Sequence, residues 1–428
     1  MSGLRATWFG VTWLVVASCL PVRAGASEPA LTSRDVVVHY AEMAQTVYGD
    51  ALAQAALLNR SVDEFLAHPD ADTMTAARTQ WKASRVPYLQ SEGFRFANAT
   101  VDEWEPRVNA WPLDEGLIDY VAPSYGTRSD DNPLYTLNVI ASQKIRIGAK
   151  EIDATTIDEK LLRMLQQAEG VQTNVSTGYH AIEFLLWGQP VRGHGPGIGQ
   201  RPASDYDIAH CTHANCARRA AYLREVSAMV VTDLAEMVAD WRPNGKARNE
   251  LLAKGPDGGL SEILTGLGSL TFGEMAGERM KLGLMLHDPE EAQDCFSDNT
   301  HNSHYYDEIG IGNVWRGRYA ASDGHVLQGP GLRDYALAKD PAAAQQLDTA
   351  LAHALASIKI IKDTADSGRM GYDQMISAGN SAGNTLVQDA MDALVAQTRA
   401  IEAVAAGLKV QVASNKSDHA QSNAAVLH

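Results

Sequence analysis

The chain has 428 residues, 45% of them hydrophobic and 21% charged, so it is long enough to bury a core and is not a disordered sequence. Its formal net charge of −16 argues against nucleic acid as a partner. The same charge is compatible with attraction of cations or with plain solubility. The sequence contains no glycine-rich phosphate loop and no G-x-S-x-G nucleophile elbow.

Residues 1–26 are typical of a secretory signal peptide. Arg5 precedes an apolar run over residues 8–20, and small residues follow this run. The run is too short for a comfortable membrane span. Removal of the signal would also remove Arg5 and Arg23 and change the net charge from −16 to −18. We therefore expect an exported protein.

Two cleavage sites are compatible with this signal. The sequence VRA at residues 22–24 or AGA at residues 24–26 suits an ordinary signal peptidase. The sequence VASC at residues 16–19 instead resembles a bacterial lipobox, which would leave Cys19 lipid-anchored. Either alternative places the mature protein outside the cytoplasm.

Apolar residues then recur at helical spacing and predict helices over residues 33–59, 61–67 and 72–96. Pro87 should kink or break the third of these helices. One stripe of this third helix mixes aromatic and charged side chains, which predicts either a salt-bridged seam between helices or the wall of a site. The stripe consists of Trp81, Arg85, Tyr88, Glu92 and Arg95.

A short helix ending at residue 121, another over residues 157–169 and a third from residue 176 or 177 to residue 188 are predicted next. Residues 189–215 are rich in Gly, Pro and His and form the best candidate for a domain boundary.

The C-terminal half is also predicted to be helical, with a polar loop from residue 294 through residue 319. Almost no stretch alternates with period two, so the sequence predicts an all-α fold of two packed helical-bundle domains. The predicted bundles span residues 34–200 and 216–410, and a flexible tail spans residues 414–428. The predicted helices of this half span residues 217–241, 259–286, 341–367 and 379–407.

The helix at residues 178–188, GYHAIEFLLWG, carries the strongest candidate for a site. It is apolar on every side except for His180 and Glu183, so it should be buried. These two residues are three apart and share one helix face. A buried carboxylate and imidazole must be hydrogen-bonded or bound to a metal, and both alternatives remain open.

The His-x-x-Glu spacing alone is uninformative because it occurs three times in this chain. His39 and Glu42 lie on an amphipathic helix, where a surface pair is expected. His287 and Glu290 flank Pro289 at a helix end, where a cap is expected. Only the pair at residues 180 and 183 lies within an apolar helix, and this burial singles it out.

A carboxylate and an imidazole suit iron, zinc, copper or manganese better than calcium. The motif lacks the second histidine of His-Glu-x-x-His zinc proteases. Two ligands are too few, so a third must come from elsewhere in the fold. Glu92 is the leading candidate for this ligand, followed by Glu42 and Glu115.

The segment HCTHANC at residues 210–216 superficially resembles a zinc cluster, but a Cys211–Cys216 disulfide is the favoured interpretation in an oxidising compartment. Other candidates have simpler structural interpretations. We expect His301 and His304 to be hydrogen-bonding side chains of a polar loop. Cys295 could act as a nucleophile with His301, but proximity within one polar loop does not make a catalytic dyad. Glu274, Glu278 and Lys281 are expected to form a solvated ion-pair face.

Several stretches resemble the imelysin family, whose members include the iron-regulated protein A group. The central one is the G-x-H-x-x-E signature within residues 178–188. Together the stretches cover most of the chain from about residue 34 to residue 408. The others are residues 88–96, 109–116, 216–223, 277–280 and 295–301.

This resemblance implies an imelysin-like pair of helical bundles with a site near their junction. It also implies a bacterial periplasmic or outer-membrane protein tied to iron acquisition. The family is labelled as M75 metallopeptidases as well, and in that case His180 and Glu183 would be catalytic. A hydrolase needs an activated water and a general base, which these two residues alone do not evidently supply. The candidate site wall comprises Trp81, Arg85, Glu115, Arg279, Ser297 and Asp298.

The leading hypothesis is a metal-binding protein of iron uptake with His180, Glu183 and Glu92 as ligands. A divalent or ferric ion is the expected cofactor, with iron first and zinc or copper as alternatives. The expected partners are the ion or an iron chelate and a membrane-bound iron transport component, with no nucleic acid. The two rival hypotheses are a metallopeptidase and a non-enzymatic partner-binding module in which the pair is a structural polar lock.

Overall fold

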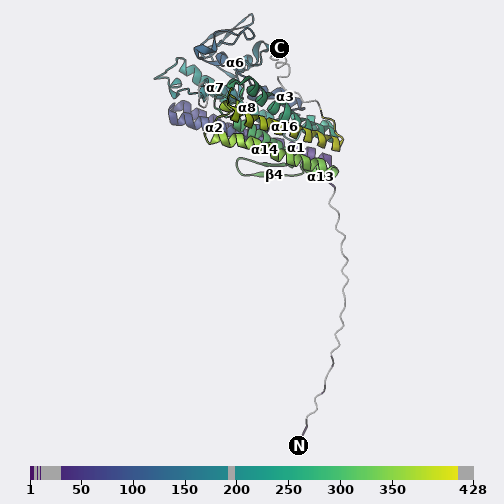
Figure 1. Cartoon of the computed structure of the whole chain (residues 1–428). Helices are drawn as coiled ribbons and strands as arrows, with labels where there is room; N and C mark the ends of the chain where they lie inside the picture. The colour runs from purple at the N-terminus through teal and green to yellow at the C-terminus, as the bar shows by residue number, and fades with distance from the viewer. Residues whose placement is uncertain (4–6, 8–9, 11–29, 191–197, 413–428) are drawn as a thin grey trace. The chain divides into compact units, whose positions relative to one another are not determined.

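The computed structural model describes residues 1–3, 7, 10, 30–190 and 198–412 (Figure 1). Most of the predicted signal peptide, including Cys19, and the predicted tail over residues 414–428 lie outside the described residues. A compact unit begins at Thr32. Across the described ranges, none of the helices combines the length and the apolar character needed to cross a membrane.

Helices make up most of this unit, which confirms the predicted all-α class. The N-terminal part contains α1 (Ser33–Ala67), α2 (Ala71–Leu89), α3 (Ala99–Trp104), α4 (Pro106–Asn109), α5 (Glu115–Ile118), α6 (Glu159–Leu165) and α7 (Gly178–Trp187). The C-terminal part contains α8 (Cys216–Trp241), α9 (Lys246–Ala253), α10 (Gly255–Gly268), α11 (Lys281–Leu286), α12 (Thr300–Arg316), α13 (Leu332–Lys339), α14 (Pro341–Asp366), α15 (Tyr372–Ile376) and α16 (Ser381–Leu408). Short 3-10 helices are η1 (Glu92–Phe94), η2 (Pro123–Tyr125), η3 (Ala168–Gly170), η4 (Ala203–Asp205) and η6 (Pro289–Glu291).

The predicted break between the helices over residues 33–59 and 61–67 is absent. Helix α1 is continuous through residues 59–61, and Thr32 caps it by accepting a hydrogen bond from the backbone N–H of Asp35. Buried apolar residues continue along α1 to Phe65, so tertiary packing carries the helix through this region. Helix α2, in contrast, ends at Leu89, two residues after Pro87, and does not reach residue 96.

Two further predictions in the C-terminal half are wrong. The predicted helix over residues 259–286 is interrupted by η5 (Ser269–Met280), a π-helix whose wider turn changes the side-chain directions. Glu274 and Glu278 are therefore buried and do not form a solvated face. The predicted loop after residue 294 becomes helix α12 at Thr300. Its buried face is largely polar, so hydrophobic periodicity could not detect it.

The strands of the described residues form two small antiparallel hairpins. Strands β1 (Lys144–Ile147) and β2 (Lys150–Asp153) pair in the register Lys144 opposite Asp153. Strands β3 (Arg318–Ala320) and β4 (Val326–Gln328) pair in the register Arg318 opposite Gln328. Neither sheet has more than two strands, so both decorate a helical core.

The longest helices form this core (Figure 1). Helix α1 packs on α2, α8 and α10, and α14 packs on α12 and α16. Because α1 contacts helices from both halves of the sequence, the division into bundles of residues 34–200 and 216–410 stays a prediction. Helix α7 packs on α2, α4 and α8, and every one of its residues is buried.

Candidate metal centre

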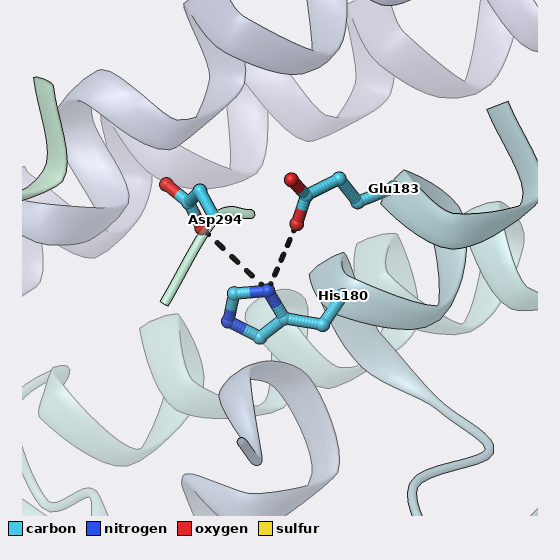
Figure 2. Close-up of side chains that lie close together, drawn as sticks. All are labelled: His180, Glu183 and Asp294. Carbon is cyan, nitrogen blue, oxygen red and sulfur yellow. Dashed lines mark hydrogen bonds and ion pairs between the residues drawn. The ribbon is translucent and has the colours of Figure 1, made fainter. Parts of the chain in front are cut away.

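Helix α7 places two ionisable side chains in the protein interior. It begins at Gly178, whose φ of +84° suits glycine, and a Cβ at this position would meet the carbonyl oxygen of Val108. His180 and Glu183 are 0% exposed, and His180 Nδ1 lies 3.1 Å from Glu183 Oε2 (Figure 2). The close approach that glycine permits thus brings the start of α7 against the backbone of α4.

A second acidic side chain completes the group. Asp294, in the turn before α12, places Oδ1 3.5 Å from His180 Nδ1 (Figure 2). One ligand atom from each of the three residues lies within 4.8 Å of the other two. Within residues 30–190 and 198–412, this is the one cluster of three or more such side chains with this spacing. Its donors, one nitrogen and two oxygens, suit a transition-metal ion.

Hydrogen bonds fix the outer oxygens of both carboxylates. Glu183 Oε1 accepts from the backbone N–H of Ser297 at 2.9 Å and from its hydroxyl at 2.7 Å. Asp294 Oδ2 accepts from the Ser303 hydroxyl and from Asn299 Nδ2. The other oxygen of each carboxylate therefore faces His180, as ligand atoms held by surrounding groups do.

Burial and charge set the protonation of this group. Burial, with a contribution from Arg85, lowers the pKa of His180 to about 3, so its imidazole is neutral as coordination requires. Burial and the neighbouring Asp294 raise the pKa of Glu183. Burial would raise the pKa of Asp294 too, but the charge of Arg85 and the hydrogen bonds from Ser303 and Asn299 outweigh it and hold this pKa below its usual value. Two carboxylates this close repel each other, and a bound cation would relieve that repulsion.

The surroundings of His180 also fit an ion. Its Nε2 is buried and has no hydrogen-bond partner among the described residues. The Trp111 ring lies 4.9 Å from the imidazole, centroid to centroid. A neutral, rigidly packed imidazole beside two carboxylates meets the chemical requirements of a metal ligand set.

The structure places the predicted third ligands elsewhere. Glu92 Oε2 accepts from Arg279 Nη2 at 2.7 Å and its Oε1 accepts from Asn109 Nδ2 at 3.2 Å. The side chain of Glu42 is 50% exposed on α1. Glu115 is buried in α5, where burial raises its pKa to about 7. None of these three carboxylates belongs to the cluster around His180.

The predicted wall residues are distributed around the cluster. Arg85 donates to Asp294 Oδ1 at 3.2 Å, and Ser297 bonds Glu183. Trp81 donates to the carbonyl of Tyr179 on α7 at 2.9 Å. Asp298 instead faces Asp373 and Lys82, and burial raises its pKa to about 7. The stripe of α2 thus contributes both an interhelical seam and a direct neighbour of the cluster.

Glu92 and Arg279 form an adjoining buried network. Arg279 donates to Glu92 and, at 2.8 Å, to Asp307 Oδ2. Asn109 joins this network to the cluster, since its Oδ1 accepts from Arg85 Nη1 at 2.6 Å. Hydrogen bonds through the side chains of Asn109 and Arg85 therefore link Glu92 to the cluster.

The other histidine motifs lie outside the cluster. His39 Nε2 is 2.9 Å from the Gly317 carbonyl, and His287 Nδ1 is 2.8 Å from the Ile376 carbonyl. His301 and His304 belong to α12 and are buried there. Cys295 is also buried.

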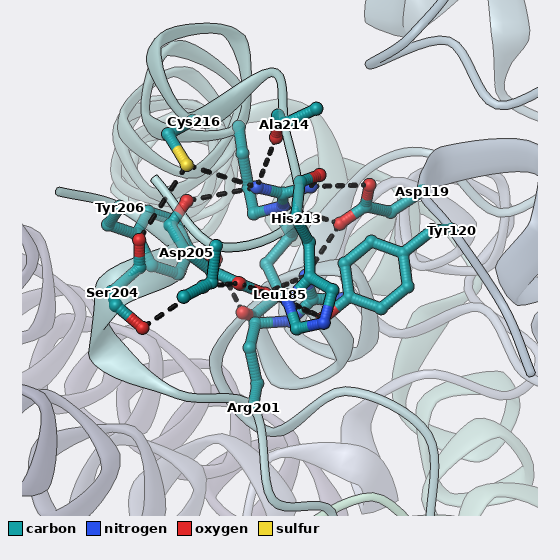
Figure 3. A network of polar contacts seen from close by, with 12 residues as sticks. Asp119, Tyr120, Leu185, Arg201, Ser204, Asp205, Tyr206, His213, Ala214 and Cys216 are labelled. Atoms are coloured by element: carbon teal, nitrogen blue, oxygen red, sulfur yellow. Dashed lines mark hydrogen bonds and ion pairs between the residues drawn. The ribbon is translucent and has the colours of Figure 1, made fainter. Parts of the chain in front are cut away.

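Cys211 and Cys216 are joined by a disulfide. A polar network lies beside it and holds the start of α8 (Figure 3). Asp119 accepts from Arg201 at 2.6 Å and from both Nε and Nη2 of Arg219 at 2.6 and 3.0 Å. The hydroxyl of Tyr206 donates to the carbonyl of Leu185 and so ties this region to α7.

Sequence reasoning found His180 and Glu183 but missed Asp294. The first two share an apolar helix, which makes their charges conspicuous. Asp294 lies in a polar stretch of 294–304 in which many residues could be ligands. Its position at the start of that stretch was the one available signal.

The fold and this cluster define an all-α protein with a buried candidate metal centre. The family model described as Peptidase_M75: Imelysin matches residues 44–401. The chain therefore belongs to the imelysin family, which confirms the resemblance seen in its motifs. No curated protein matches the chain.

Two solved structures share the fold. One, described as an iron-regulated protein A precursor from Parabacteroides distasonis, has a TM-score of 0.62 and 16% identity, and the match covers 89% of this chain and 97% of that one. The other, an imelysin-like protein from Psychrobacter arcticum, has a TM-score of 0.56 and 16% identity, covering 90% of this chain and 99% of that one. At this level of identity the similarity establishes the fold alone.

Proposed function

We propose that His180, Glu183 and Asp294 bind a metal ion and that the protein serves iron acquisition. The observation that carries this proposal is the convergence of one imidazole and two carboxylates, each 0% exposed, on a common point. Such a group is costly to bury unless something compensates its charge. A cation does so directly.

Iron is the first choice of ion, with zinc and copper as alternatives. Imidazole suits all three metals, and carboxylate oxygens add hard donors that favour iron over copper. The description of one structural neighbour as an iron-regulated protein A precursor supports the same choice. The bound ion would supply Lewis acidity or redox chemistry, and the protein's own residues would supply its retention and shielding.

The proposed cellular setting follows from the N-terminal sequence. We place the protein in the bacterial periplasm or at the outer membrane, with lipid attachment at Cys19 as one alternative. A free ion or an iron chelate is the proposed cargo, and a membrane-bound transport component is the proposed recipient. Support comes from the signal-like residues 1–26 and from the acidic net charge.

Titration of the metal-free protein with iron, zinc and copper tests the proposal. We expect one tight site whose iron affinity falls about 100-fold or more in Glu183→Gln and Asp294→Asn, because each change removes a charged ligand. Glu42→Gln is the matched control, since Glu42 belongs to a His-x-x-Glu pair on α1 but lies outside the cluster. Unchanged iron binding in both cluster variants, with their fold intact, would refute the proposal.

A metallopeptidase is the second candidate, favoured by the family model's description as a peptidase. It requires a general base, yet Ser297 and His180 already engage the two oxygens of Glu183. This candidate predicts peptide turnover that chelators abolish and that Glu183→Gln removes. Absence of turnover by clean protein across a peptide library would exclude it.

A partner-binding module without metal is the third candidate. In that case the buried pair would only stabilise the fold. His180→Ala and Glu183→Ala would then lower the free energy of unfolding without any change in metal binding. The metal titration separates this outcome from the leading proposal.

A further inference from the structure

A cavity of about 380 Å³ connects the protein surface with the neighbourhood of the candidate metal centre. Asp102 and Gln172 in its lining are exposed, whereas Asn109 and Gln293 in the same lining are buried. Helix α4 contributes to this lining, so we call it the α4 cavity. The cavity is therefore open to solvent at one end and reaches buried residues at the other.

Two lining residues connect the inner end of this cavity with the cluster. The Trp111 ring lines the cavity and lies 4.9 Å from the His180 imidazole, centroid to centroid. Gln293 lines it as well and directly precedes Asp294 in the chain. None of the three cluster residues lines the cavity itself. The side chain of Trp111 thus lies between the cavity and His180.

Trp111 lies on a connection that can open locally. Residues 110–114 join α4 to α5 outside any helix, and Trp111 is half-buried. Short non-helical segments at the surface open at a lower free energy than buried core helices. A movement of this connection would expose His180 without unfolding α7.

A second cavity, of about 220 Å³, approaches the cluster between α2 and α12. Arg85 lines it and donates to Asp294, so passage from this side would require displacement of Arg85. Arg85 is 0% exposed, lies on α2, and stacks its guanidinium on three aromatic rings. Its displacement would break a buried ion pair and leave Asp294 without this partner, which is costly. Access to the cluster is therefore easier past Trp111.

A buried acceptor lies along the α4 cavity. Gln293 is 2% exposed, and its Oε1 has no donor among the described residues. A buried acceptor of this kind costs free energy until a donor reaches it. The water molecules of a hydrated cation are such donors, so this oxygen can accept from an ion's hydration shell close to the point where the shell must be shed.

We propose that the α4 cavity is the route by which an ion from solvent reaches the His180 cluster, and that Trp111 is the gate that closes this route. The identity of the ion rests on the proposed function. The route and the gate are properties of the metal-free protein and can be tested without metal.

Chemical labelling of the metal-free, full-length chain tests the gate. Diethyl pyrocarbonate modifies neutral imidazoles that it can reach, and peptide mass spectrometry measures its rate of reaction at His180. We expect Trp111→Ala and Trp111→Leu each to raise this rate about 10-fold or more, because a smaller side chain leaves the route open more of the time. Tyr306→Ala is the matched control, since it removes a large ring from the lining of the second cavity. His304, which is 0% exposed on α12, should react equally slowly in every variant if no general unfolding occurs.

Iron exchange supplies a second readout. Ferrous iron is added under anaerobic conditions to the metal-free chain, and the loaded protein is then mixed with a strong chelator. Trp111→Ala should accelerate both loading and release about 10-fold, because a gate limits passage in both directions. A residue that only stabilised the bound ion would accelerate release and leave loading unchanged.

Unchanged labelling of His180 in both Trp111 variants, with their fold intact, overturns the proposal. Equal acceleration of labelling by Tyr306→Ala overturns it as well, and so does release that accelerates without loading. If the wild-type chain bound no iron, the proposed function would fail, and labelling of the metal-free chain would still decide whether Trp111 closes the route. Trp111→Leu retains an apolar side chain and keeps the test decisive even if Trp111→Ala does not fold.

Discussion

Ser297 acts on the proposed centre through Glu183. Its hydroxyl and its backbone N–H both donate to Oε1, which orients the carboxylate. Ser297→Ala removes the hydroxyl and keeps the N–H. We expect the pKa of Glu183 to rise further and iron affinity at pH 7 to fall about 10- to 100-fold, as measured by competition with a chelator.

Ser227→Ala is the matched control for this prediction. Ser227 is also buried, and its hydroxyl donates to Asn59 at 2.8 Å, away from the cluster. The control should lose some stability and no iron affinity. Equal loss of affinity in both variants would show that Ser297 has no orienting role.

We expect Glu115 to make a pH-dependent contribution to the free energy of unfolding. Burial raises its pKa from 4.5 to about 7 in the folded state, so the folded protein binds this proton more tightly than the unfolded chain. Its contribution is fully present below pH 4.5 and is lost as the pH rises through about 7. Glu115→Gln keeps a neutral side chain at every pH and should remove this loss, on the order of 2 kcal/mol.

Urea unfolding of both proteins at pH 5 and pH 8 measures the effect. We expect the variant to gain stability relative to wild type at pH 8 and not at pH 5. The same stability difference at both pH values would contradict the raised pKa of Glu115.

At the scale of elements, the start of α7 depends on a residue without a side chain. Gly178 has φ +84°, and an added Cβ would meet the Val108 carbonyl. Gly178→Ala should destabilise the protein by about 3 kcal/mol, measured by urea unfolding, because strain and collision add. Gly126→Ala is the control, since its φ is +92° but nothing lies within 4 Å of its Cβ. A similar loss of stability in both variants would show that backbone strain alone causes the destabilisation.

The elements differ in how far the sequence predicts them. Apolar helices such as α7, and long amphipathic ones such as α8, α14 and α16, were predicted to within two residues at each end. Helix α12 was missed because its buried face carries His304, Asp307 and other polar groups. The π-helix was missed because a wider turn leaves no distinct signature in α-helical periodicity.

The candidate site likewise contains residues that the sequence predicts and one residue that it does not. His180 and Glu183 could be predicted because two ionisable residues within one apolar helix are costly and therefore conspicuous. Asp294 reaches them only through tertiary structure, across more than a hundred residues of sequence. Local patterns carry no information on such a contact.

At the scale of the whole molecule, Asp119 stabilises the connection between distant segments. It accepts hydrogen bonds from Arg201 and Arg219, and all three side chains are buried. Asp119→Asn leaves two buried guanidinium groups short of a counter-charge and should cost about 3–5 kcal/mol in urea unfolding. Asp130→Asn, at an exposed pair with Arg128, should cost less than about 1 kcal/mol. A small effect of Asp119→Asn would show that the network is redundant.

The complete burial of His180, Glu183 and Asp294 has a kinetic consequence. An ion held there can exchange only when the surrounding structure opens, so local unfolding and not affinity sets its residence time. We expect release to a strong chelator to proceed at a rate independent of chelator concentration, and to accelerate when α7 is loosened by Gly178→Ala. Such a protein would protect the bound ion from competing ligands and would release it only to a partner that opens the fold.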